Sequence, residues 1–291
     1  MAVRMVTLEL KTEMTSVDIL RMTAVVLTCI TFSLVASVFH TNATFWTYCM
    51  FTWCFCFCVT ILIMVLEFTS LSTKLPISWN DFTTAFAMLA TMMVLVASIV
   101  YPRFYICLKC GRQICASVTS CLCFILYTAE VILTRSRSGE VSGFMSTVPG
   151  LLKVLEAFVA CIIFICLENI GDFTYAGLHW CVAVYSICFV SAIFVIILTI
   201  CRLLTVFPGP LDKVLLFNNL LAVLMYSTAA VIWPLYSFRN NPRPSICDIF
   251  PYMFCGWDLL VVITALTVLN LIAYIVDSVY CFRMVFFDSS T

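Results

Sequence analysis

The chain is 291 residues long; 64% of its residues are hydrophobic and only 10% are charged. A water-soluble domain is about half apolar and about a quarter charged, and a fold of this size could not bury so much apolar surface, so a water-soluble protein is excluded. Lys plus Arg number 15, as do Asp plus Glu, so no excess of positive charge indicates a nucleic-acid partner.

Eight apolar segments follow one another along the chain, each close to the roughly 20 residues that a helix needs to cross a bilayer. We place them near residues 22–39, 49–71, 82–101, 114–134, 151–168, 179–201, 214–236 and 259–281. The first 18 residues carry charges of both signs and no apolar core, so we expect the first segment to remain as a signal anchor. The sequence therefore predicts an all-α, polytopic integral membrane protein with eight transmembrane helices.

The second segment opens with "FTWCFCFC", residues 51–58, in which three cysteines alternate with aromatic residues. A period of two suggests a β-strand, but an isolated strand in lipid would leave its backbone unpaired. On a helix, Cys54 and Cys58 share one face while Cys56 points nearly opposite. The three thiols then do not converge, and we expect packing residues rather than a metal site.

Eight crossings place both termini on one side of the membrane. If that side is the cytosol, ten of the fifteen Lys and Arg residues lie in cytosolic segments. The other five are Arg103, Lys109, Arg112, Arg239 and Arg243. The positive-inside rule therefore favours a cytosolic N-terminal tail, residues 1–16, and a short cytosolic C-terminal tail, residues 287–291.

The two halves of the chain resemble each other. A shift of 132 residues brings Arg21 onto Lys153, and "ASIVYP" at 97–102 onto "AAVIWP" at 229–234. The pair "WC" at 53–54 recurs at 180–181, five residues out of step, and "YTAE" at 127–130 resembles "YIVD" at 274–277 with an offset of 147. An even number of helices per repeat makes the repeats parallel. We expect two tandem four-helix units, residues 17–138 and 142–286.

Carboxylates stand near the predicted cytosolic ends of four segments: Glu67, Glu130, Glu156 and Asp277. An ionisable group inside the bilayer is costly and suggests a function, but near an interface it can also pair with a cation. Because Arg21 matches Lys153 and Glu130 matches Asp277 across the repeats, we expect one ion pair per unit between its first and fourth helices. A proton or ion pathway is the alternative.

Some cysteines and one asparagine are candidates for covalent modification. In the predicted outer loops, where disulfides form, we expect a bond between Cys247 and Cys255, and a weaker candidate joins Cys107 and Cys110. On the inner side, Cys201 and Cys281 lie beside arginines, as palmitoylated cysteines do. "NAT" is an N-glycosylation sequon at Asn42, but the short loop keeps it close to the bilayer.

The sequence carries no signature of an enzyme. His40 and His179 belong to no metal-binding spacing, and there is no nucleophile elbow, P-loop or dinucleotide-binding fingerprint. We therefore expect no catalytic residue, no metal and no cofactor.

Four stretches, "FTWCFCFCVTILI", "ASIVYP", "GEVSGFMSTVPGLLKVLEAFVACIIF" and "WCVAVYSICF", are similar to the myeloid-associated differentiation marker family. The similarity runs from about residue 20 to residue 283 and is densest between 139 and 190. The resemblance implies two tandem MARVEL domains, a tetraspan module, corresponding to the two repeats. The N-terminal tail differs from the Ser/Thr-rich tail of that family, so functions of the tail do not carry over.

The resemblance further implies a non-enzymatic role in cholesterol-rich membrane domains: membrane organisation, vesicle traffic and positioning of proteins at the cell surface. The implied partners are membrane lipids, other membrane proteins and cortical signalling proteins, at the plasma membrane and on trafficking vesicles. Two other functions stay open, a transporter or channel at the seam between the repeats and an adhesion protein at membrane appositions. Only 8 glycines occur in the chain, whereas transporters often carry broken, glycine-rich helices at the midplane.

Overall fold

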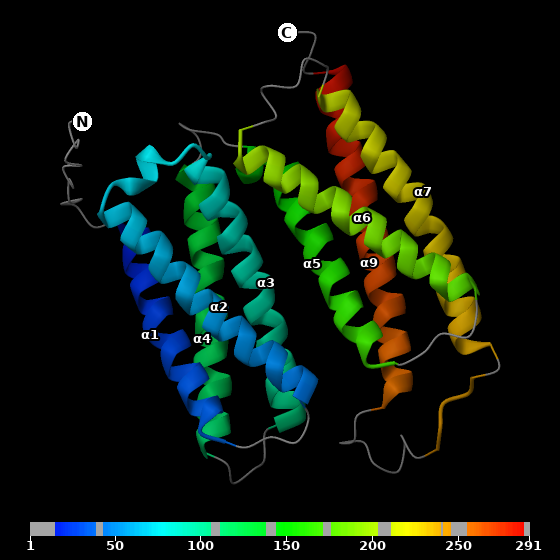
Figure 1. The fold of residues 1–291 in the computed structure, drawn as a ribbon, viewed down its shortest axis with the longest axis horizontal. Helices are drawn as coiled ribbons and strands as arrows, with labels where there is room; N and C mark the ends of the chain where they lie inside the picture. The colour runs from blue at the N-terminus through cyan, green and yellow to red at the C-terminus, as the bar shows by residue number, and fades with distance from the viewer. Residues whose placement is uncertain are drawn as a thin grey trace, which may run out of the picture. The chain divides into compact units, whose positions relative to one another are not determined.

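The computed structural model describes residues 15–38, 43–105, 111–137, 144–170, 176–202, 211–239, 241–245 and 255–287. Eight long helices account for most of these residues (Figure 1). They are α1 (Ser16–Ala36), α2 (Ala43–Phe68), α3 (Trp79–Tyr105), α4 (Gly111–Arg137), α5 (Val148–Glu168), α6 (Ala176–Ile200), α7 (Leu211–Phe238) and α9 (Gly256–Phe286). All eight are long and apolar enough to cross a membrane, and no strand occurs in the described ranges. The predicted all-α fold with eight transmembrane helices is confirmed.

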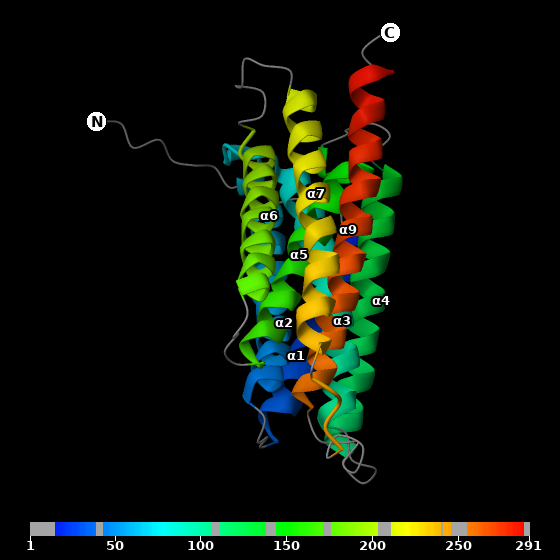
Figure 2. The same ribbon diagram turned by 90° about the vertical axis from the view of Figure 1, so that its right-hand side faces the viewer.

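The helices form two compact units, residues 1–146 and 147–291. In unit 1, α1 packs against α2 and α4, and α3 packs against the same two helices. In unit 2, α5 and α7 each pack against α6 and α9 in the same way. Each unit is therefore a four-helix bundle in which the first and fourth helices are neighbours, as Figure 1 shows. Figure 2 shows α7 beside α9 in unit 2.

Helix α1 begins six residues before the predicted start of the first segment, because its N-terminus is capped. The side chain of Thr15 accepts a hydrogen bond from the backbone of Asp18, and the Asp18 carboxylate accepts one from the Thr15 backbone. This capping box satisfies N–H groups that the first turn leaves unpaired. The early start places Arg21 inside the helix, where it is 5% exposed.

Two matched prolines lie inside helices rather than ending them. Proline usually ends or kinks a helix, yet α3 continues past Pro102 to Tyr105, and Pro234 likewise lies inside α7. Membrane helices tolerate proline where neighbouring groups satisfy the freed carbonyl. Helix α3 therefore extends four residues beyond the approximate end at residue 101 that hydrophobicity predicts.

The repeat keeps one register through the first three helices of each unit. The buried residues Cys49, Trp53 and Cys56 of α2 correspond, at the offset of 132, to the buried residues Cys181, Tyr185 and Cys188 of α6. Trp180, which we matched to Trp53 from the "WC" pair, is 47% exposed, whereas Trp53 is fully buried. The "WC" match is therefore a chance similarity, and the predicted shift of five residues is wrong.

The aromatic core confirms this register. Trp53 lies edge-on to Tyr101, with ring centroids 5.4 Å apart, and Tyr185 lies 6.3 Å from Trp233. In unit 1 the tryptophan is on the second helix and the tyrosine is on the third, whereas in unit 2 the two residue types are the other way round. Each unit therefore keeps one tryptophan–tyrosine contact at this position. Trp53 donates to Ser120 Oγ, and Tyr185 shares a hydrogen bond with Thr267 Oγ1, the residue that matches Ser120 at the offset of 147.

Residues 144–146 pack with unit 1, although the sequence repeat predicts that they belong to the second unit. They form a short 3-10 helix, and the Met145 N–H donates to Asp81 Oδ1 of α3 over 2.8 Å. The Met145 side chain is fully buried. The boundary between the compact units thus falls after residue 146.

Candidate functional site

Arg21 of α1 lies between two carboxylates in unit 1. Its Nε atom is 2.6 Å from Glu130 Oε1 of α4, and its Nη1 atom is 2.7 Å from Glu67 Oε2 of α2. Trp79 Nε1 of α3 donates to the other oxygen of Glu67 over 3.0 Å. This group, cluster 1, therefore draws one polar side chain from each helix of the bundle.

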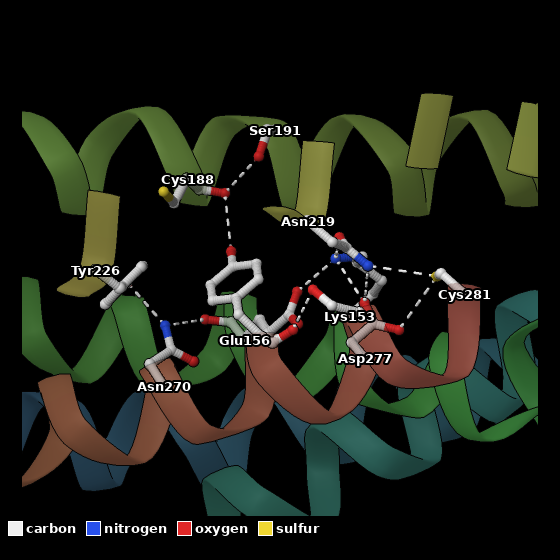
Figure 3. A network of polar contacts seen from close by, with 11 residues as sticks. Lys153, Glu156, Cys188, Ser191, Asn219, Tyr226, Asn270, Asp277 and Cys281 are labelled. Atoms are coloured by element: carbon white, nitrogen blue, oxygen red, sulfur yellow. Dashed lines mark hydrogen bonds and ion pairs between the residues drawn. The ribbon is translucent and has the colours of Figure 1, made fainter. Parts of the chain in front are cut away.

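Lys153 of α5 holds the corresponding position in unit 2. Its Nζ atom is 2.7 Å from Glu156 Oε2 on the same helix and 2.8 Å from Asp277 Oδ2 on α9. It also donates to Asn219 Oδ1 of α7. These four residues and Cys281, which contacts Asp277 and Asn219, form cluster 2 (Figure 3).

The structure thus brings together both residue pairs that the repeat suggested, Arg21 with Glu130 and Lys153 with Asp277. Sequence reasoning missed that each cation binds a second carboxylate. In unit 1 this is Glu67 on the second helix; in unit 2 it is Glu156 on the first helix. The spacing of Lys153 and Glu156 was a readable signal, because residues three apart lie on one helix face.

Asn219 was also missed as a member of cluster 2. Its Oδ1 accepts from Lys153, and its Nδ2 donates to Asp277 Oδ2 over 2.8 Å, so one amide bridges both ions. The equivalent residue of unit 1 is Ala87. No pattern within the sequence separates Asn219 from the adjacent Asn218, since only the rotation of α7 in the bundle decides which of them faces inward.

Both clusters are shielded from solvent. In cluster 1 the side chains of Arg21 and Glu130 are 6% and 3% exposed, while Glu67 is 19% exposed. In cluster 2 Lys153 is 2% exposed and both carboxylates are fully buried. Taking ions out of water costs several kcal/mol each, and only close, well-bonded partners compensate. Such clusters can join helices firmly, and they specify which helices meet.

Further polar groups of unit 2 lie next to cluster 2. Asn270 of α9 donates to the Tyr226 hydroxyl over 2.8 Å and to the backbone oxygen of Glu156 over 3.2 Å. Tyr274 donates to the Cys188 carbonyl, and its ring faces the Lys153 ammonium with 5.0 Å from Nζ to the centroid. These contacts bind all four helices of the unit to one another (Figure 3).

The cysteines of α2 lie as helical geometry predicts. Cys56 is buried, whereas Cys54 and Cys58, four residues apart, are partly exposed and exposed, so the three thiols do not converge. Phe51 and Phe55 stack with ring centroids 5.5 Å apart. Among the described residues, no group of three or more His, Cys, Asp and Glu side chains could hold a metal ion.

Several candidate modification sites fall outside the described residues: Cys107, Cys110, Cys247 and Asn42. Cys255 is described, directly before α9, and it is disulfide-bonded. Every other described cysteine is free. Because Cys247 cannot be placed, its pairing with Cys255 stays a prediction.

The two candidate palmitoylation sites differ in access. Cys201 is a free thiol of intermediate exposure directly after the end of α6. Cys281 is 2% exposed, and its Sγ atom donates to Asp277 Oδ1 over 3.7 Å. An acyl chain on Cys281 would require the sulfur to leave cluster 2, so we reassign this residue to the cluster and keep Cys201 as the candidate.

Comparison with known proteins gives the family. The MARVEL family, described as a membrane-associating domain, matches residues 15–133 and 144–280. The chain is 43% identical over 285 residues to the myeloid-associated differentiation marker homolog of Xenopus laevis, covering 93% of both chains. It is 42% identical to the human myeloid-associated differentiation marker, covering 92% of this chain and 88% of the relative. It is 40% identical to myeloid-associated differentiation marker-like protein 2 of Rattus norvegicus, covering 91% of both.

No solved structure matches the chain. Two MARVEL matches, one in each four-helix unit, and identities of 40–43% over nearly the whole length agree with the eight membrane-spanning helices. The chain belongs to the MARVEL family of multi-span membrane proteins and, within it, to the myeloid-associated differentiation marker proteins.

Proposed function

We propose that this chain is a non-enzymatic membrane scaffold, which organises cholesterol-rich membrane domains and positions partner proteins or vesicles at the cell surface. The observation that carries the proposal is how each unit distributes its side chains. The buried ions are bonded to one another in clusters 1 and 2, while the helix faces that point outward are apolar.

The outward face of α6 illustrates what such a chain offers its surroundings. Ile187, Val190 and Phe194 are 54%, 64% and 57% exposed. Their spacing of three and four residues places them on one stripe of the helix. In a bilayer, an apolar stripe of this kind can contact acyl chains, sterol or the transmembrane helix of a partner through close van der Waals packing.

A transporter working inside one unit is less well supported. Transporters place their substrate sites near the midplane, where broken helices leave backbone groups open to a substrate. Here the polar groups inside each bundle are largely engaged with neighbouring helices, as the Arg21 and Lys153 contacts illustrate. The proposed partners are membrane lipids together with membrane or cortical signalling proteins, at the plasma membrane and on trafficking vesicles.

Proximity labelling in intact cells, combined with detergent-resistant fractionation, tests the proposal. We expect cholesterol depletion to change both the labelled neighbours and the density at which the protein fractionates, and cholesterol repletion to restore both. The repletion arm controls for general damage to the membrane. Unchanged neighbours and unchanged density after depletion would contradict the proposed role.

A further inference from the structure

Cluster 2 contains more negative than positive groups. Among the described residues, Lys153 is the one cation that contacts the two carboxylates of this cluster, Glu156 and Asp277, and all three side chains are at most 2% exposed. If both carboxylates were ionised, the cluster would carry an uncompensated negative charge away from water. Two carboxylates sharing such a site disfavour double ionisation, because like charges at close range repel strongly in a medium of low dielectric.

The hydrogen bonds around the two carboxylates are unequal. Asp277 accepts from three donors: Lys153 Nζ at 2.8 Å, Asn219 Nδ2 at 2.8 Å and Cys281 Sγ at 3.7 Å. Glu156 accepts from Lys153 through Oε2 alone, and its buried Oε1 atom has no hydrogen-bond partner among the described residues. An ionised carboxylate is stabilised by several donors. The surroundings of Asp277 therefore suit an ion, and those of Glu156 suit a neutral acid.

A second buried acceptor without a donor belongs to a residue in contact with Glu156. Asn270 donates through Nδ2 to the Glu156 backbone oxygen and to Tyr226, while its Oδ1 atom is buried and has no partner among the described residues. Buried polar atoms are normally paired. Figure 3 shows Glu156 and Asn270 beside each other. Two acceptors without donors in neighbouring residues indicate that hydrogen-bond donors are too few at this edge of cluster 2.

We propose that cluster 2 is a proton-binding site, in which one proton resides on Glu156 and the ammonium of Lys153 pairs with the ionised carboxylate of Asp277. The interior of unit 2 is then neutral, and the Glu156 hydroxyl supplies a donor that the cluster otherwise lacks. The other titratable groups near the site are Cys188 of α6, Tyr226 of α7, and Tyr274 and Cys281 of α9. These phenols and thiols add no counter-charge.

Cluster 1 provides an internal control. Its second carboxylate, Glu67, is 19% exposed and accepts hydrogen bonds at both oxygens, from Arg21 and from Trp79. Water and two donors can stabilise the charge of Glu67, so Glu67→Gln is the matched control for Glu156→Gln. The inference does not depend on the proposed scaffold function.

Infrared spectroscopy of the full-length protein in lipid nanodiscs tests the proposal, because a protonated carboxylic acid has a C=O stretch that a carboxylate lacks. At neutral pH the exposed carboxyl groups are ionised, so the wild type should show one such band, from Glu156. The band should be absent in Glu156→Gln and unchanged in Glu67→Gln. It should also be lost in Asp277→Asn, where Glu156 becomes the counter-ion of Lys153 and releases its proton. Absence of the band from the wild type, or its persistence in Glu156→Gln, would overturn the proposal.

Thermal stability against pH gives a second readout that distinguishes a proton from a bound sodium ion. If the folded chain holds a proton that the unfolded chain releases at neutral pH, stability falls as pH rises. We expect the melting temperature of the wild type to fall more steeply than that of Glu156→Gln between about pH 6 and about pH 9. Equal slopes, or stabilisation by sodium over choline that Glu156→Gln abolishes, would overturn it.

Discussion

At the scale of single residues, the position of a polar atom decides whether it stabilises the fold. Asn218 and Asn219 are adjacent in α7, yet their side chains have opposite roles. Asn219 is fully buried and bonds to both Lys153 and Asp277, whereas Asn218 has a buried Nδ2 atom without a hydrogen-bond partner among the described residues. The cost of removing a polar group depends on the partners that it leaves behind.

Replacement of these two asparagines by leucine should therefore have unequal effects. Asn219→Leu leaves Lys153 and Asp277 each without one hydrogen bond, and we expect a loss of about 1–3 kcal/mol in the free energy of unfolding. Asn218→Leu removes a buried Nδ2 group that has no partner among the described residues, so its effect should be close to zero or slightly stabilising. Thermal unfolding of the two purified variants and the wild type measures the change in stability for each. Equal losses in the two variants would contradict the assigned rotation of α7.

The disulfide at Cys255 yields a prediction at the same scale. If its partner is Cys247, Cys247→Ser frees the Cys255 thiol on the outer side of the membrane. A membrane-impermeant maleimide should then label intact cells that express Cys247→Ser, and labelling should disappear in Cys247→Ser/Cys255→Ser. Unchanged labelling in Cys247→Ser, with new labelling in Cys107→Ser or Cys110→Ser, would assign the bond to another cysteine.

At the scale of helices, the repeat determines which residues point inward. Trp53 of α2 is fully buried between Tyr101 and Ser120, whereas Trp180 of α6 is half exposed and donates to Thr228 on the same exposed surface. The residue of α6 that fills the place of Trp53 is Tyr185. Identical residues in the two repeats thus have different environments, and burial identifies which residue of α6 corresponds to Trp53 of α2.

Alanine substitutions test this register. Trp53→Ala should cost about 3–5 kcal/mol, because it removes a large buried ring and leaves a cavity. Trp180→Ala should cost less than about 1 kcal/mol, as exposed substitutions usually do. The two melting temperatures of the purified variants provide the comparison. If Trp180→Ala lowered the stability as much as Trp53→Ala, the "WC" match would be restored and the offset of 132 between α2 and α6 would be refuted.

Hydrophobicity and spacing alone predict the eight helices and the tandem repeat, since both depend on features that each segment carries by itself. The start of α1 was missed because a local capping box, Thr15 with Asp18, extends the helix beyond its apolar core. The second carboxylate of each cluster was missed because it changes helix between the units, from Glu67 to Glu156. A contact that occurs in only one of the two repeats cannot be found by aligning their sequences.

At the scale of the whole molecule, the eight described helices place both termini on the same side of the membrane, but they do not determine which side that is. An even number of crossings puts the start of α1 and the end of α9 on one side of the membrane, and we propose from the distribution of Lys and Arg that this side is the cytosol. Clusters 1 and 2 occupy matched positions in the repeat, and the proposed topology would place both toward the cytosolic ends of their helices.

Epitope tags can establish this orientation. Tags at the N-terminus and the C-terminus should be stained by antibody only after the plasma membrane is permeabilised. A tag inserted at residues 241–245 should be stained on intact cells, which controls for surface delivery. Staining of either terminus on intact cells would reverse the topology and place both clusters at the outer leaflet.

The central claim is that each unit is a bundle whose first and fourth helices are joined by a buried ion pair. A charge exchange between Arg21 and Glu130 tests it most directly, with surface expression and thermal stability as readouts. Glu130→Lys places two cations together and should reduce both strongly. Adding Arg21→Glu should restore part of each, because the opposite charges again face each other; Glu67 still faces position 21, so recovery stays incomplete. A double variant no better than Glu130→Lys alone would contradict the claim.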